Sequence, residues 1–134
     1  MSNNTVGSVG LYLVNGTGGK IGTPGAPLLK YSLLVNAVTG AITGQAVQTQ
    51  ALAAPYNEIH ISNITGQVRA TGLGSYTKVV TLTGSAVISF PPPAIGSYLA
   101  PFSAHIAVDN AWNGVGGWTL GNTNVENVPF HEDK

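Results

Sequence analysis

Carboxylate and imidazole side chains in the middle of the chain are of the types that perform acid–base or metal chemistry. Glu58 and His60 are two residues apart, so on a β-strand their side chains would point to the same face. With His105 or Asp109 from another strand, they could form a metal site or an acid–base cluster. An exposed strand face explains the same pattern without chemistry. A hydrolase or metal enzyme at Glu58, His60 and His105 therefore stays a weak alternative.

A second candidate lies between residues 109 and 122, where two tryptophans alternate with amide side chains. A tryptophan ring can stack on a sugar while neighbouring amides bind the sugar hydroxyls. This hypothesis assigns ligand binding to Asn110, Trp112, Asn113, Trp118 and Asn122. The structural alternative, which we favour, is that both tryptophans pack in the core and the asparagines form turns.

Other catalytic motifs are incomplete or absent. Segment 16–20, Gly-Thr-Gly-Gly-Lys, resembles a phosphate-binding loop, but Val14 holds the first glycine position and Ile21 follows the lysine in place of Ser or Thr. No serine lies in a Gly-x-Ser-x-Gly context. Cysteine is absent, which excludes disulfides and thiolate metal sites. We therefore expect no cofactor and no bound metal.

The charge content limits the classes of partner. Five Lys and Arg balance five Asp and Glu, and Arg69 is the only arginine. Nucleic-acid binding is not expected, because it needs clustered cations. The apolar runs are too short for a membrane-spanning helix. The N-terminus lacks the basic and apolar regions of a secretory signal, so the cytoplasm is the default expectation, with signal-independent export left open.

Two long segments, 31–57 and 79–108, contain no Asp, Glu, Lys or Arg. Strand edges in these segments would lack the charges that normally prevent edge-to-edge pairing. Association with another protein or with further copies of the chain is therefore expected.

The elements that position these side chains are predicted to be β-strands. The pattern of an apolar residue, Thr, Gly and later another apolar residue occurs in 42–47, 64–69 and 82–87, which indicates half-buried strands that bend or bulge at the glycine. The expected strands are 9–14, 28–36, 42–50, 58–70, 76–90, 98–108 and 118–120. Hairpin turns are expected at Asn15-Gly16 and Asn113-Gly114, a corner at Pro91–Pro93, and a short helical turn at 51–54.

This spacing predicts an all-β fold, an antiparallel β-sandwich or barrel of roughly seven to nine strands with little helix. We expect one domain over 1–134, with flexible ends at 1–8 and 131–134.

Three stretches carry a family resemblance: Gly10–Asn15, Pro27–Asn36 and Ser89–Phe102. They resemble a small bacterial family catalogued only as a domain of unknown function, number 1842. The resemblance covers most of the chain and implies a bacterial single-domain protein. It transfers no mechanism, because the family has no established activity.

The sequence therefore leaves two hypotheses for the function, from different classes. The leading hypothesis is a non-enzymatic binding or interaction module whose charge-poor surface engages another protein or its own copies. The alternative is a lectin-like carbohydrate binder that uses the Trp and Asn loops. Exposure of the two tryptophans distinguishes them, since buried rings cannot stack on a sugar.

Overall fold

The structure, a computed structural model, describes residues 10–52, 57–71 and 74–133, and these form eight antiparallel β-strands and no helix. Consequently, no helix in this part of the chain could cross a membrane. The strands are β1 Leu11–Gly18, β2 Leu28–Asn36, β3 Ala41–Thr49, β4 Glu58–Ala70, β5 Lys78–Ser89, β6 Ser97–Val108, β7 Gly114–Leu120 and β8 Thr123–Glu132.

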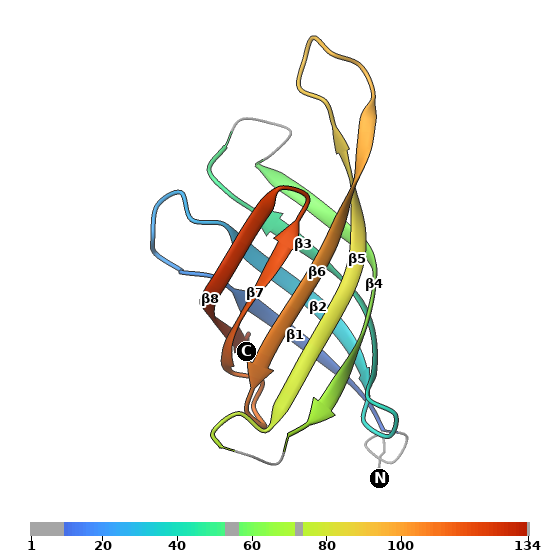
Figure 1. Ribbon diagram of the computed structural model, residues 1–134, viewed down its shortest axis with the longest axis vertical. Helices are drawn as coiled ribbons and strands as arrows, with labels where there is room; N and C mark the ends of the chain where they lie inside the picture. Colours follow the sequence, from blue (N-terminus) through green and yellow to red (C-terminus); the bar gives the residue numbers. More distant parts are fainter. Residues whose placement is uncertain (1–9, 53–56, 72–73, 134) are drawn as a thin grey trace.

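The strands form a closed barrel in which each strand pairs with the next and β8 returns to β1 (Figure 1). The prediction of an all-β fold is confirmed, and of the two predicted architectures the barrel is the one present. The closing seam is short, because Gly16–Gly18 pair with Phe130–Glu132 only. A further hydrogen bond from Gly19 N to Pro129 O extends it by one step.

Alternating side chains fill the barrel interior. An eight-stranded barrel is just wide enough for inward-facing side chains to pack against one another. Three aromatic rings meet in its middle: Trp118 packs edge-on against Phe130 at 6.0 Å between ring centroids, and Tyr31 lies 6.2 Å from the same ring. All three side chains are buried, so the interior is a packed core.

The predicted hairpin turn at Asn15-Gly16 is wrong, because β1 continues through it to Gly18. These glycines serve packing instead. A Cβ atom at Gly16 would collide with the ring of Tyr31, and one at Gly18 would collide with the ring of Phe130. The Asn-Gly pair therefore leaves room for large aromatic side chains inside the barrel.

The predicted irregularities occur at two of the three repeated glycines, Gly44 and Gly84, whereas Gly66 pairs in regular register with both neighbouring strands. The pairing register of β3 with β4 shifts between Gly44 and Ala46. In β4 the register against β5 shifts around Asn63, which has a positive φ of 55° and lies opposite Gly84. These bulges increase local twist and help the sheet to close.

The C-terminal segment differs from the prediction. Residues 131–134 were expected to fray, but His131 and Glu132 complete β8 and help to close the barrel. Asp133 extends this contact, since its backbone N–H donates to Asn15 O at 2.8 Å and its carboxylate accepts from the Thr17 hydroxyl at 2.9 Å. Residues 1–8 and 134, and residues 53–54 of the predicted helical turn, lie outside the described residues.

Candidate functional site

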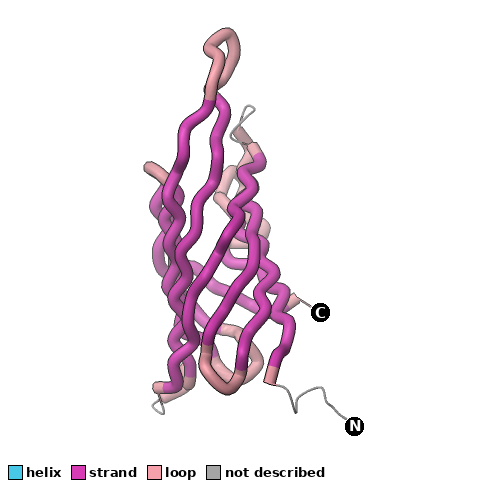
Figure 2. The backbone as a smooth tube through the Cα atoms, turned by 90° about the vertical axis from the view of Figure 1, so that its right-hand side faces the viewer, coloured by secondary structure: helices cyan, strands magenta, loops and turns pink. Residues whose placement is uncertain are grey.

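The β5–β6 hairpin is longer than its neighbours and projects beyond the barrel (Figures 1 and 2). The two strands pair with each other as far as Ser89 and Ser97. Pairing of β4 with β5 stops at Ala86, and pairing of β7 with β6 stops at Phe102. Residues 87–99, called the arm below, therefore form a two-stranded ribbon with no paired strand on either side among the described residues.

The tip of the arm is built from a proline turn. Pro91–Pro93 end β5 because they supply no amide proton to a ladder. The turn is closed by hydrogen bonds from Ala94 N to Pro91 O and from Phe90 N to Gly96 O. Gly96 has a φ of 119°, which suits glycine. The predicted corner between two strands is thus confirmed as a hairpin turn.

Large apolar side chains of the arm are exposed, except Ile88, which faces the mouth and is buried. Their exposed fractions are 69% for Val87, 42% for Phe90, 96% for Ile95, 40% for Tyr98 and 68% for Leu99. Val87 and Leu99 are direct cross-strand partners, and so share the outer face of the ribbon. The rings of Phe90 and Tyr98 pack 5.4 Å apart. Residues 87–99 contain no Asp, Glu, Lys, Arg or His.

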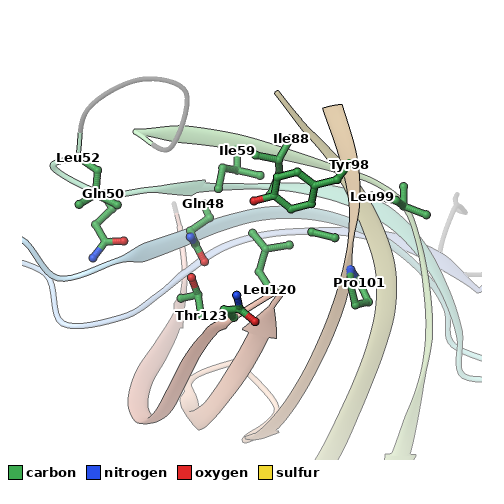
Figure 3. Close-up of a pocket in the computed structure, with 13 residues that line it drawn as sticks. Gln48, Gln50, Leu52, Ile59, Ile88, Tyr98, Leu99, Pro101, Leu120 and Thr123 are labelled. Atoms are coloured by element: carbon green, nitrogen blue, oxygen red, sulfur yellow. The ribbon is translucent and has the colours of Figure 1, made fainter. Parts of the chain in front are cut away.

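A hollow of about 590 Å³ opens at the end of the barrel from which the arm rises, and we call it the mouth. Its floor is formed by five inward-facing residues, Gln48, Ile59, Ile88, Ala100 and Leu120. In Figure 3 the ring of Tyr98 reaches from the arm over this hollow, whereas Leu99 points to the opposite side. None of the described residues that line the mouth is charged.

One polar group is fixed at the base of the mouth. The indole N–H of Trp118 donates to Gln48 Oε1 at 2.7 Å, and the Gln48 side chain is buried. A buried amide needs such a partner, because an unpaired polar group is costly away from water. Gln48 was not predicted as a site residue, because in the sequence it resembles the exposed Gln45 and the half-buried Gln50 around it. The only indication in the sequence was strand alternation: Gln48 is two residues after Ala46, so both side chains point to the inner face of β3.

The opposite end of the barrel is occupied by Trp112, and we call it the tryptophan end. Trp112 is buried with a φ of 64°, and Tyr12 packs edge-on against its ring at 6.3 Å. The ammonium group of Lys78 lies 5.5 Å from the ring centroid. A hollow of about 570 Å³ at this end includes both Lys78 and Glu132 in its lining. The two ends therefore differ in charge.

The five predicted ligand-binding residues do not form one site. Asn110 and Trp112 line the tryptophan end, Trp118 lies inside the barrel, and Asn122 lines the mouth. Asn113 accepts a hydrogen bond from a backbone N–H of β8. Trp112 and Trp118 are only 3% and 1% exposed. Neither ring can serve as a platform for a sugar.

Glu58 and His60 share the outer face of β4, as predicted, with 3.1 Å between Glu58 Oε1 and His60 Nε2. Both side chains are exposed. His105 is separated from them, because it pairs with Thr81, which in turn pairs with Gln67, seven positions along β4 from His60. In the described part of the chain, no three His, Asp or Glu side chains gather as a metal site would require.

The model of the family described as "Domain of unknown function (DUF1842)" matches residues 9–124. The chain belongs to the DUF1842 family. The resemblance seen in the sequence is thereby confirmed, and the DUF1842 match spans β1 to β7, including the whole arm. No curated protein sequence matches the chain.

Proposed function

We propose that this DUF1842 protein is a non-enzymatic interaction module that binds a polypeptide partner through the arm and the mouth. The observation that carries the proposal is the arm itself. It is a two-stranded ribbon, uncharged, with large apolar side chains exposed on it.

The energetics of the arm favour a covered state. A lone two-stranded ribbon is marginally stable in water, and five large side chains exposed on one leave an apolar area on the order of several hundred Å², comparable with the largest patch on a typical monomer. Among the described residues, no strand pairs along either long edge of the ribbon, so a strand of a partner could extend the sheet there. A polypeptide partner could therefore bury the exposed apolar side chains and pair with an edge of the ribbon.

The arm and the mouth offer one continuous surface. Ile88, at the base of the arm, and Ala100, next to the arm on β6, both belong to the floor of the mouth. A partner that contacts the arm at Tyr98 would therefore also reach the mouth. Because this surface carries no charge, it suits an apolar polypeptide segment better than a charged ligand.

Site-specific photocrosslinking in cells that express the protein tests this proposal. A photoreactive p-benzoylphenylalanine replaces Leu99 on the outer face of the arm in one variant and Val38 in a matched control. Val38 is also an exposed apolar residue but lies in the β2–β3 turn at the tryptophan end. A discrete protein adduct from position 99, absent from position 38, is expected. No adduct from the arm, or equal adducts from both positions, would contradict the proposal.

A further inference from the structure

We propose that the polypeptide bound by the arm and mouth is a second copy of this chain. In this arrangement two molecules meet mouth to mouth with their arms antiparallel, and the tip of each arm enters the mouth of the other copy. The inference rests on the proposed function and specifies the partner.

The first argument is that one end of the molecule carries both halves of a contact. The arm is a projecting apolar element, and the mouth beside it is an uncharged hollow whose lining combines apolar side chains with Gln50, Asn122 and Thr123. A two-fold symmetric interface requires a surface that is complementary to itself, so that a residue of one copy meets a different residue of the other, and the reverse. A knob and a hollow placed side by side satisfy this requirement.

The second argument is geometric. The arm extends past the end of the barrel (Figures 1 and 2), and the mouth lies at that end. Six residues of extended chain, as from Val87 to the turn at Pro92, span roughly 20 Å. If the two-fold axis passes between two antiparallel arms, each tip is carried to the level of the opposite rim. Ile95, exposed at the tip, would then approach the partner's mouth.

The third argument concerns charge. Neither the arm nor the lining of the mouth contains a charged residue, so docking would bury no unpaired charge, which is a common cost of association. The formal net charge of the whole chain is +0, so two copies do not repel each other at long range. The tryptophan end lacks this property, since its hollow includes Lys78 and Glu132.

The fourth argument is size. A stable interface buries about 800 Å² on each partner. The exposed side chains of the arm offer an area on the order of several hundred Å², and the rim of the mouth adds to it, while the floor is already buried. Arm and rim together therefore approach the size of a small interface, which suits a weak, concentration-dependent dimer.

Sedimentation equilibrium of the purified full chain, from low micromolar to near-millimolar concentration, is the first test. We expect a monomer–dimer equilibrium that is weakened at least about tenfold by Ile95→Asp, since the variant must bury a charge in a hollow that offers no opposite charge among its described residues. Val38→Asp is the matched control at the tryptophan end and should leave the equilibrium unchanged. Circular dichroism should show the same β spectrum for all three proteins. A monomer at every concentration, or equal weakening by both variants, would overturn the inference.

The absence of cysteine allows a second, geometric test. Protein with Ile95→Cys is mixed with protein carrying Asn122→Cys, a residue at the rim of the mouth, and the thiols are joined with a short bismaleimide. Cross-linked pairs should combine one copy of each variant. With Val38→Cys in place of Asn122→Cys, such mixed pairs should not form. A preference for Ile95→Cys pairs with each other would overturn the insertion of tip into mouth.

Failure of self-association and failure of the proposed function give different results. A purified chain that stays monomeric, while position 99 captures a different protein in cells, would overturn self-association but retain the interaction module. Absence of both dimer and adduct would overturn both proposals.

Discussion

The two halves of the β5–β6 hairpin share one sequence pattern but have different surroundings. In the lower half, Val80 and Leu82 face the barrel core and are buried, because β4 and β7 continue the sheet on either side. In the arm the alternation continues, but of its inward-facing side chains only Ile88 at the mouth is buried, whereas Phe90 and Tyr98 on the same face are 42% and 40% exposed. The comparison shows that an inward-facing apolar side chain of this hairpin is buried only where the barrel encloses it.

The largest expected difference between the two halves is in stability. Leu82→Ala should lower the free energy of unfolding by about 2–5 kcal/mol, because it leaves a cavity in a packed core. Leu99→Ala removes the same atoms from an exposed position and should change it by no more than about 0.5 kcal/mol. Urea denaturation at low protein concentration, where the chain would be monomeric, measures both.

An equal loss of stability in the two variants would break the comparison, since it would mean that Leu99 is already covered within one molecule. A stability difference between Leu99→Ala and the unsubstituted protein that appears only as protein concentration rises would instead sharpen the comparison. Association of the folded state adds stability by mass action, and the variant would gain less of it.

The sequence predicted the strands better than it predicted their neighbours. Strands 28–36 and 58–70 were predicted with the observed bounds, because alternation of Leu, Val and Ile with polar residues is a local signal. Strand β8 was missed, since Asn, Thr and Glu dominate Thr123–Glu132 and its burial depends on Val128 and Phe130 contacting distant strands. The residues at which β4 and β7 stop pairing with the hairpin depend on packing in three dimensions. The arm could therefore not be recognised from the sequence.

The candidate site was missed for a related reason. The ligand-binding hypothesis was built on the two tryptophans, although the favoured interpretation placed them in the core. The uncharged run 79–108 pointed toward an interaction surface, but nothing local distinguishes its buried half from its exposed half. Gln48 likewise depends on Trp118, seventy residues away in the chain.

A second, smaller effect should mark the boundary between barrel and mouth. Gln48→Leu leaves the buried Trp118 N–H without its acceptor and should cost about 1–3 kcal/mol. Gln45→Leu, on the exposed face of the same strand, is the matched control and should be near neutral. Thermal or urea unfolding of both variants measures the difference. If the two substitutions cost the same, the hydrogen bond at the base of the mouth contributes nothing specific to the fold.

The smallest effect on stability at neutral pH is expected for a substitution of Tyr31, which lies in the barrel. At alkaline pH, Tyr31 should make stability depend on pH, whereas the arm should not. Burial in the barrel raises the pKa of the Tyr31 phenol, and the negative charges of Asp133 and Glu132 raise it further. In the unfolded chain this pKa is about 10. Above that pH the folded state holds a proton that the unfolded state has lost, so stability is intact below about pH 10 and falls as pH rises, by up to about 1.4 kcal/mol per pH unit.

Tyr31→Phe should remove this alkaline loss. At neutral pH it should leave stability unchanged or slightly raised, because the buried Tyr31 hydroxyl has no hydrogen-bond partner among the described residues. Leu99→Ala, in the arm, should keep the full alkaline slope of the unsubstituted protein. Urea unfolding of all three proteins across the range from neutral to strongly alkaline pH provides the measurement. A Tyr31→Phe variant that loses stability above about pH 10 as steeply as the other two would show that the alkaline sensitivity arises elsewhere in the barrel.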